Sequence, residues 1–262
     1  MKLVIDNKSK LEVFVAIFQL LKNWNSGIRI QFSEDGLYIQ TMDKSHICLS
    51  DININSEWFS KYETTENVSI CVDSMHFSIL MNYALKNDCL ELIYTEDDCD
   101  KLFVNCLSGP TNGNEKSSFD HFFELSLIDI EQDSFNIPNI EYDVEFTIDS
   151  KKIIDSLTDL NTFGSDLNIK CFENVIEMNA SSETTKLKID IPIDDLKEYA
   201  VTEEDDNMDV NFSLSHLSKM CTSIKLSQNI EIGISKECPM VLIYNLGNES
   251  NVRFYIAPKV SD

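Results

Sequence analysis

One pattern recurs four times along the sequence: a short apolar strand, a residue that can cap a helix, an amphipathic helix, and further strands. The expected capping residues are Asp6, Asp73, Asp149 and Ser213, spaced roughly 65 to 75 residues apart, an interval typical of repeated supersecondary units. Asp and Ser are favoured there because their side-chain oxygens accept hydrogen bonds from the free N–H groups of the first helical turn. We therefore expect four β-α-β-β-β units.

The first unit shows the pattern in full. Residues 3–5 form an apolar strand, and Asp35-Gly36 lies between two alternating apolar runs, as in a tight hairpin. A further strand is expected at 47–54. The helix between the first two strands carries apolar side chains at i, i+3, i+4, i+7 and i+10, namely Leu11, Phe14, Val15, Phe18 and Leu21.

The number of units suggests how they assemble. A chain of 262 residues has enough apolar residues for one large core or two smaller ones. Four units pair naturally into two similar domains with antiparallel sheets, each covered on one face by two helices, which is an α+β architecture. Two polar segments, 108–118 and the acidic run 203–206, are expected to be mobile loops.

A different kind of segment lies at the midpoint of the chain. Residues 126–142 mix large apolar side chains with acids at no steady period, and Pro138 lacks the N–H that a central strand or helix needs. The segment is therefore expected to be an extended connector. It either packs on its own domain or forms one wall of a groove for a partner, because its apolar side chains must lie on something.

The charge excludes one class of function. The chain has 45 acids against 21 bases, a net charge of -24, and its only arginines are Arg29 and Arg253. Proteins that grip DNA through phosphate contacts usually present a basic patch with several arginines. A conventional site-specific DNA-binding protein is therefore not expected, and any role on DNA needs a mechanism other than tight contact.

The cysteines indicate a reducing compartment. The eight cysteines are scattered and form no C-x-x-C pair, which favours reduced thiols over disulfides or a zinc site. The longest apolar run, 13–18, is far too short to span a membrane, and the sequence shows no targeting signal. We expect a soluble protein with no membrane association.

Motifs for catalysis are not found. The sequence contains no nucleophile elbow, P-loop or dinucleotide fingerprint, and its four histidines show no metal spacing, so neither an enzyme nor a cofactor is expected. An acidic group that includes Asp97 and Asp98 is a candidate metal cluster. It lies between two expected strands, where a solvated hairpin tip is the favoured interpretation.

Three separated segments carry a resemblance to a known family. Residues 41–49 (TMDKSHICL), 136–142 (NIPNIEY) and 254–260 (FYIAPKV) are similar to the eukaryotic proliferating cell nuclear antigen family of sliding DNA clamps. The resemblance extends over essentially the whole chain. It implies the DNA-clamp fold, with an N-terminal domain at 1–125, an interdomain connecting loop at 126–142 and a C-terminal domain at 143–262.

The resemblance also implies a function. The chain would form a homotrimeric ring around duplex DNA in the nucleus, with sheets outside and helices lining the hole. It would act as a processivity factor for DNA polymerase and as a docking platform for replication and repair proteins, with no catalytic activity. Its partners would be duplex DNA without sequence preference, the polymerase, the clamp loader and other proteins.

In the family, partners carry a Gln-x-x-aliphatic-x-x-aromatic-aromatic peptide that binds an apolar groove beneath the connector. Burial of two aromatic side chains in such a groove can supply several kcal/mol. The matching residues are Met42, His46, Ile47, Leu49, Phe135, Ile137, Tyr142, Pro239, Tyr255, Ala257, Pro258, Lys259 and Val260. Phe135 stands where the family usually has Leu.

The family also lines its ring with basic helices and closes it through edge strands. The matching lysines are Lys10, Lys22, Lys86, Lys152, Lys219 and Lys225, each of which can equally be a plain solvated lysine. The matching edges are 118–126 and 184–190. Around 170–174 the lysine that the family usually modifies has no clear counterpart.

Two other functions stay open at this point. Within the same fold, the chain could be a subunit of a heterotrimeric checkpoint clamp, although those subunits resemble the family less well at 257–259. From a different class, an acidic metal-dependent hydrolase would use Asp97 and Asp98. The mass of the protein in solution and a metal titration discriminate between these possibilities.

Overall fold

The computed structural model describes residues 1–109, 119–130, 134–201, 208–221, 224–236 and 238–259. The chain divides into two compact units. Unit 1 comprises residues 1–44, 51–135 and 246–251, and unit 2 comprises residues 45–50, 136–245 and 252–262. Within the described residues, no helix is long and apolar enough to cross a membrane.

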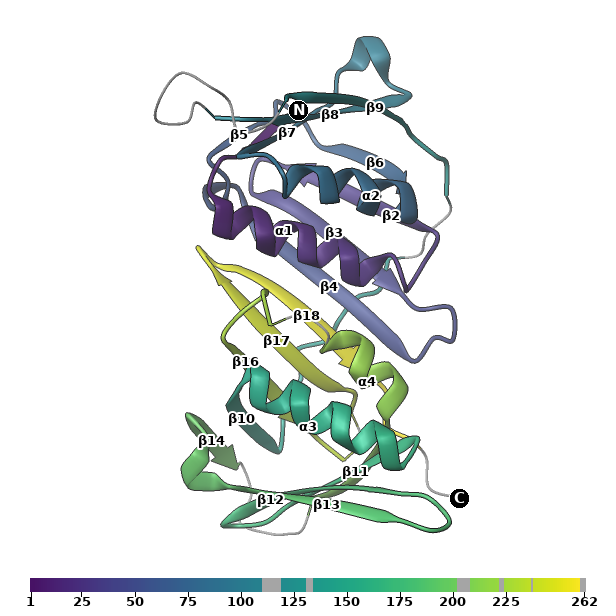
Figure 1. Ribbon diagram of the computed structural model, residues 1–262, viewed down its shortest axis with the longest axis vertical. Helices are drawn as coiled ribbons and strands as arrows, with labels where there is room; N and C mark the ends of the chain where they lie inside the picture. The colour runs from purple at the N-terminus through teal and green to yellow at the C-terminus, as the bar shows by residue number, and fades with distance from the viewer. Residues whose placement is uncertain (110–118, 131–133, 202–207, 222–223, 237, 260–262) are drawn as a thin grey trace. The chain divides into compact units, whose positions relative to one another are not determined.

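Unit 1 contains the β-α-β-β-β order twice (Figure 1). Residues 48–50 at the start of β4 are grouped with unit 2. The elements are β1 (Lys2–Ile5), α1 (Lys8–Leu21), β2 (Gly27–Ser33), β3 (Gly36–Met42), β4 (Cys48–Asn55), the 3-10 helix η1 (Ser56–Trp58), β5 (Lys61–Glu63), β6 (Val68–Asp73), α2 (Ser74–Ala84), β7 (Cys89–Ile93), the 3-10 helix η2 (Glu96–Asp98), β8 (Lys101–Leu107) and β9 (His121–Ser126).

In unit 1, strands of one β-α-β-β-β repeat pair with strands of the other repeat. One sheet has the order β5-β1-β7-β8-β9, and the other strands follow the order β4-β3-β2-β6. The first strand of each repeat pairs with a strand of the other repeat, because β1 pairs with β7 and β6 pairs with β2, both antiparallel. Neither repeat therefore completes its sheet alone.

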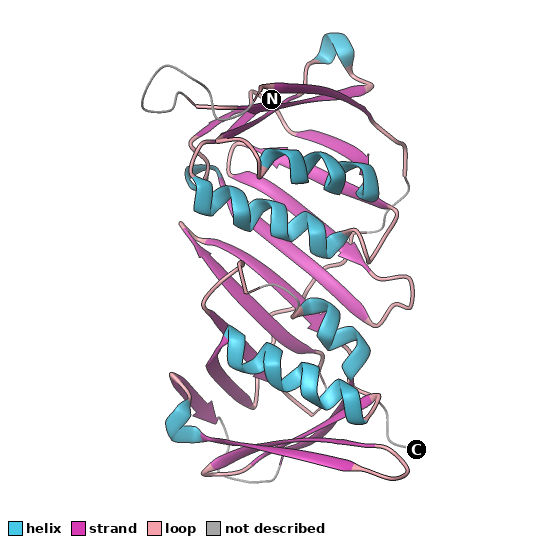
Figure 2. Cartoon of the chain, viewed as in Figure 1, coloured by secondary structure: helices cyan, strands magenta, loops and turns pink. Residues whose placement is uncertain are grey.

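The two helices of unit 1 lie side by side and cover the sheets (Figure 2). Their contact is made by aromatic rings: Phe18 stacks edge to face with Phe14 on its own helix and with Phe77 of α2, at centroid distances of 5.0 and 4.7 Å. All three side chains are completely buried. The apolar stripe expected from the sequence thus forms the core between helices and sheets.

Unit 2 has the same order of elements (Figure 1). The elements are β10 (Val144–Asp149), α3 (Ser150–Phe163), β11 (Asp166–Cys171), β12 (Val175–Ser181), β13 (Lys186–Pro192), the 3-10 helix η3 (Ile193–Asp195), β14 (Glu198–Val201), β15 (Met208–Ser213), α4 (Leu214–Met220), β16 (Asn229–Ile234), β17 (Met240–Gly247) and β18 (Ser250–Ile256).

The pairing in unit 2 reproduces that of unit 1. Strand β10 pairs with β16, and β11 pairs with β15, both antiparallel. One sheet has the order β13-β12-β11-β15, and the other strands follow the order β14-β10-β16-β17-β18. Helices α3 and α4 contact each other, as α1 and α2 do. The prediction of four β-α-β-β-β units in two similar domains is confirmed.

Two of the four expected caps are wrong in detail. The residue that caps α1 is Asn7, whose side chain accepts a hydrogen bond from the Lys10 N–H, whereas Asp6 accepts one from the Ser60 hydroxyl. Ser213 precedes α4 but its side chain makes no capping hydrogen bond. Asp73 and Asp149 cap α2 and α3 as expected.

Two short strands that pair with β1 and β10, namely β5 and β14, were not predicted from the sequence. Two loops were expected to be mobile, 108–118 and 203–206. Residues 110–118 of the first and all of the second lie outside the described residues.

Candidate partner and DNA interfaces

The connector is fixed to unit 1 where it leaves β9. The Ile128 N–H donates a hydrogen bond to the Cys71 carbonyl of β6, at 2.9 Å. The Arg29 guanidinium of β2 donates to the Ile130 carbonyl, also at 2.9 Å. The side chains of Ile128 and Ile130 lie so close to Gly27 of β2 that a Cβ there would be about 3.1 Å from their methyl groups. The connector therefore crosses β6 and then β2 in close contact.

The next anchor lies on β3. The Gln40 carboxamide accepts a hydrogen bond from the Phe135 N–H at 2.7 Å and donates one to the Phe135 carbonyl at 3.0 Å. Its amide nitrogen also lies 3.3 Å from Asp51 Oδ2, which accepts a second hydrogen bond from the Tyr38 hydroxyl at 2.7 Å. One buried side chain thus holds both polar groups of the Phe135 backbone.

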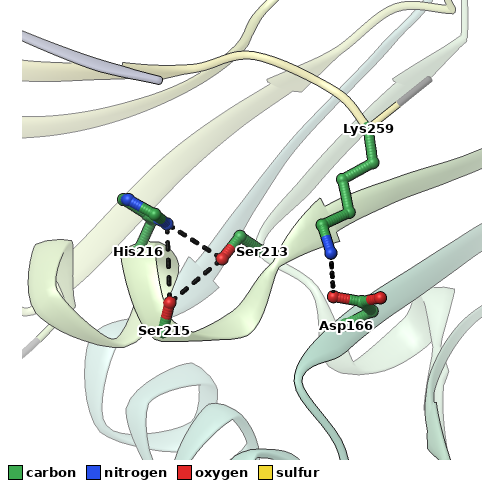
Figure 3. A network of polar contacts seen from close by, with 5 residues as sticks. All are labelled: Asp166, Ser213, Ser215, His216 and Lys259. Carbon is green, nitrogen blue, oxygen red and sulfur yellow. Dashed lines mark hydrogen bonds and ion pairs between the residues drawn. The ribbon is translucent and has the colours of Figure 1, made fainter. Parts of the chain in front are cut away.

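In unit 2, the end of the chain is held beside the loop that precedes β4. The Ala257 N–H donates to the Ile47 carbonyl at 3.0 Å, and the Lys259 N–H donates to the Asn211 carbonyl at 2.7 Å. The Lys259 ammonium forms an ion pair with Asp166 at the start of β11 (Figure 3). These contacts place 257–259, expected to line the groove, against 45–50.

A histidine ties the same loop to α4. His216 Nε2 lies 3.2 Å from the Ser45 hydroxyl, and His216 Nδ1 lies 2.9 Å from the Ser213 hydroxyl. Ser215 completes the cluster, with its hydroxyl 3.1 Å from that of Ser213 (Figure 3). The Ser213 hydroxyl is engaged here, which explains why it does not cap α4.

Tyr142, at the end of the connector, lies against strand β16 of unit 2. Its ring covers Gly233 of β16 so closely that a Cβ at this position would be 2.7 Å from the ring. Burial raises the pKa of the Tyr142 hydroxyl, and the nearby Tyr255 hydroxyl adds to the increase. The next residue, Asp143, accepts a hydrogen bond from the Ser235 hydroxyl at 2.7 Å. Tyr142 and Tyr255 are therefore close enough to interact electrostatically.

The expected groove residues have one property in common. Apart from Val260, which lies outside the described residues, every one of them keeps part of its side chain accessible to solvent, so none is a pure core residue. The most exposed are His46, Phe135 and Lys259. Those that are half-buried are Met42, Ile47, Leu49, Ile137, Tyr142, Pro239, Tyr255, Ala257 and Pro258.

The lysines expected to face DNA differ from one another. Lys10 is half-buried: its ammonium donates to the Trp58 carbonyl at 2.6 Å and lies 5.3 Å from the centre of the Trp58 ring. Lys86 is exposed, and its ammonium lies 5.0 Å from the centre of the Tyr83 ring. Lys22 is half-buried, whereas Lys152, Lys219 and Lys225 are exposed.

Neither α2 nor α3 carries a net positive charge. The exposed residues of α3 include Lys151 and Lys152 but also Asp155 and Asp159, so the charges of this helix face nearly cancel. The exposed residues of α2 include the apolar Met75 and Ile79, which are 53% and 46% exposed. Neither helix presents the dense basic stripe of a protein that binds DNA by phosphate contacts.

The acidic group near Asp97 and Asp98 lies in η2, between β7 and β8, where both side chains are exposed. A hydrogen bond with Glu66 raises the pKa of Glu96. Within the described residues, no group of three or more His, Cys, Asp or Glu side chains is arranged to hold a metal ion.

Comparison with known families decides the identity of the fold and its function. The model of the proliferating cell nuclear antigen N-terminal domain matches residues 8–134, and the model of the C-terminal domain matches residues 136–259. The chain belongs to the proliferating cell nuclear antigen family. It is a sliding clamp of this type.

Individual relatives agree with this assignment. The clamp is 27% identical over 234 residues to the proliferating cell nuclear antigen of Chaetomium thermophilum, and the match covers 88% of both chains. Its fold matches a chain in the crystal structure of the PCNA2-PCNA3 complex from Sulfolobus tokodaii, with a TM-score of 0.85, 21% identity and 99% of each chain covered.

Several residues that shape the clamp's candidate interfaces were not singled out from the sequence. Gln40, Asp51 and Arg29 fix the connector, and Lys151 adds a charge beside Lys152. The alternation along β3 places Gln40 between the buried Ile39 and Thr41, but it does not reveal that Gln40 is itself buried beneath the connector.

Proposed function

We propose that this clamp assembles as a homotrimeric ring around duplex DNA in the nucleus, raises the processivity of a DNA polymerase and docks replication and repair proteins. Its role is to tether other proteins rather than to catalyse a reaction. The observation that carries the proposal is that, in the described chain, each unit ends one of its sheets with an edge strand: β9 in unit 1 and β13 in unit 2.

The two edge strands have matching character. Along β9, Phe123 and Leu125 are half-buried and alternate with exposed residues, and Leu187 and Ile189 do the same along β13. An edge strand leaves a row of backbone donors and acceptors without partners, which favours pairing with another chain. Pairing β9 of one copy with β13 of the next would satisfy both edges and continue around a closed ring.

The first test is the mass of the purified protein by light scattering. A mass near three times the 30.0 kDa chain supports the homotrimer. We expect Leu125→Glu or Ile189→Glu to yield monomers, because each places a charge in the paired edge. Ile224→Glu is the matched control, since Ile224 is 57% exposed and lies on neither edge. A wild-type monomer, or edge variants with the wild-type mass, would contradict the proposal.

The second test concerns partner binding. We propose that the groove residues bind the Gln-x-x-aliphatic-x-x-aromatic-aromatic motif, with 126–142 as the connector between domains 1–125 and 143–262. Ile137→Asp should weaken binding of a labelled peptide with this motif at least tenfold, because a buried unpaired charge costs more than one factor of ten. Fluorescence anisotropy measures this, with Ile224→Asp as the control. Unchanged binding by the Ile137 variant would remove Ile137 from the groove.

A heteromeric clamp is the second candidate. The observation that favours it is the solved relative, which is a complex of two different clamp subunits. In that case the purified chain would stay monomeric and reach a larger mass only when mixed with another clamp subunit. The light-scattering measurement therefore separates the two assemblies.

A further inference from the structure

We propose that Gln40 is a positioning residue for partner binding, because its carboxamide holds both backbone polar groups of Phe135, one of the expected groove residues. The inference deepens the proposed function and rests on the groove being a peptide-binding site. It adds a residue outside the groove residues themselves, beneath the connector rather than facing the peptide.

Gln40 uses both polar atoms of its carboxamide to bind the Phe135 backbone. Its side chain accepts from the Phe135 N–H and donates to the Phe135 carbonyl, so it occupies both backbone groups as a neighbouring strand would. Gln40 is only 9% exposed, whereas Phe135 is 36% exposed. The buried Gln40 carboxamide thus holds the backbone of Phe135, whereas the Phe135 side chain is accessible to a partner.

Asp51 and Tyr38 determine which way the carboxamide points. An ionised carboxylate only accepts hydrogen bonds, so Asp51 Oδ2 selects the Gln40 amide nitrogen as its neighbour. This leaves the Gln40 oxygen directed at the Phe135 N–H. The Tyr38 hydroxyl in turn holds Asp51, at 2.7 Å. These contacts therefore fix both the position and the orientation of the Gln40 carboxamide beside Phe135.

Ile137, another expected groove residue, follows Phe135 by two residues in the chain. A connector released at Phe135 would retain its anchors at Ile128 and Ile130, but the segment that leads to Ile137 would lose the anchor next to it. We therefore expect peptide affinity to depend on Gln40 although Gln40 need not touch the peptide.

The test uses Gln40→Glu and a pH series. The ionised carboxylate has no donor for the Phe135 carbonyl, whereas the protonated acid has one donor and one acceptor and can restore both bonds to Phe135, with no proton left for Asp51. Burial and the adjacent Asp51 carboxylate should raise the pKa of the introduced acid. For a labelled Gln-x-x-Leu-x-x-Phe-Phe peptide, the ratio of the variant's Kd to that of wild type should be on the order of ten at pH 8 and fall toward one as the pH falls to about 5.

The ratio of the two Kd values removes pH effects that are the same in both proteins, such as any at His46 and His216. Asp51 and Tyr38 face position 40, so the introduced acid and Asp51 act as a coupled pair in the variant. Gln40→Met, which keeps the length of the side chain but forms no hydrogen bond, should raise Kd by a similar factor at every pH. Gln31→Glu, at an exposed position of β2, should raise Kd at no pH and so controls for added charge.

Exchange of the Phe135 amide hydrogen gives a readout that needs no peptide. Its protection in wild type, corrected for the intrinsic exchange rate at each pH, should be lost in Gln40→Met, which offers the Phe135 N–H no acceptor. A Gln40→Glu ratio that does not change with pH, or a protected Phe135 amide in Gln40→Met, would overturn the inference. Failure of wild type to bind the peptide would overturn the proposed function instead, while the exchange measurement still decides whether Gln40 holds the connector.

Discussion

Single side chains at the helix starts show how local and long-range contacts compete. Asp73 accepts a hydrogen bond from the His76 N–H at 2.8 Å, and this bond is the main cause of the lowered pKa of Asp73. The Asp73 carboxylate also lies 2.8 Å from His76 Nδ1. Because the bond favours the ionised carboxyl, it stabilises the folded state where Asp73 is charged.

We expect Asp73→Ala to lower the free energy of unfolding by about 1 kcal/mol at neutral pH, the usual cost of losing an N-cap. A folded-state pKa below the unfolded value means that the part of the contribution that depends on the charge of Asp73 is complete above pH of about 4 and is lost as the pH falls through the folded pKa. Urea unfolding at pH 7 and pH 3 measures the difference.

Asp73→Asn is the control for this prediction, because an amide oxygen caps a helix about as well as a carboxylate but does not titrate. It should retain most of the stability at both pH values. A deficit of Asp73→Ala that is equally large at pH 3 would show that the cap does not depend on the charge of Asp73.

The cap of α1 illustrates what the sequence can and cannot predict at this scale. Asp6 and Asn7 are adjacent and both are good capping residues, so the sequence predicts the start of the helix to within one residue. The choice is made by Ser60, which is 54 residues away in sequence and donates to Asp6. The same limit applies to Gln40, whose role depends on Phe135, 95 residues further along the chain.

At the scale of elements, periodicity predicts helices and long strands because it reflects which side chains face the core. It predicts α1 to α4 and most strands of both units. Periodicity does not predict that β1 pairs with β7 and β6 with β2, each in the other repeat, because pairing depends on which strands meet in space. Strand β5, with three residues, and β14, with four, are too short to show alternation and are defined by pairing with β1 and β10.

Helix α3 allows a test of the core of unit 2. Leu157 is 3% exposed and helps to line an apolar cavity of about 20 Å³ together with Ile153, Leu217 and other residues. Leu157→Ala should lower the free energy of unfolding of unit 2 by about 2 to 5 kcal/mol, because it removes buried methyl groups and enlarges the cavity. Urea unfolding followed by circular dichroism measures the loss.

The matched control on the same helix is Asn161→Ala, which should change the stability by less than about 0.5 kcal/mol because Asn161 is exposed. Equal stabilities of the two variants would mean that α3 does not pack its Leu157 face into the core as described.

At the scale of the whole molecule, the family could be predicted from three short segments, whereas the charge of the chain raised a question that the fold helps to answer. A net charge of -24 repels DNA, and few lysines of the helices are exposed. A closed ring retains DNA by encircling it, so weak phosphate contacts are compatible with long residence and favour sliding.

Whether the lysines contact DNA can be measured from the salt dependence of DNA binding. Each lysine that neutralises a phosphate contributes about 0.9 to the slope of log K against log salt concentration. Substituting Lys86, Lys152, Lys219 and Lys225 together by Gln should therefore weaken binding to a labelled duplex more at about 50 mM salt than at about 200 mM. The slope should fall by up to about 0.9 for each phosphate that is no longer neutralised.

The control must change the net charge equally without touching the helices. The exposed residues Lys44, Lys61, Lys197 and Lys236 meet this condition, and their substitution by Gln should leave the slope nearly unchanged. If both sets of substitutions lower the slope alike, DNA responds only to the overall charge of the clamp, and the first four lysines have no special place at the DNA. If only the first set lowers it, the face formed by the helices and the residues that follow them lies toward the DNA, as a ring with its sheets outside requires.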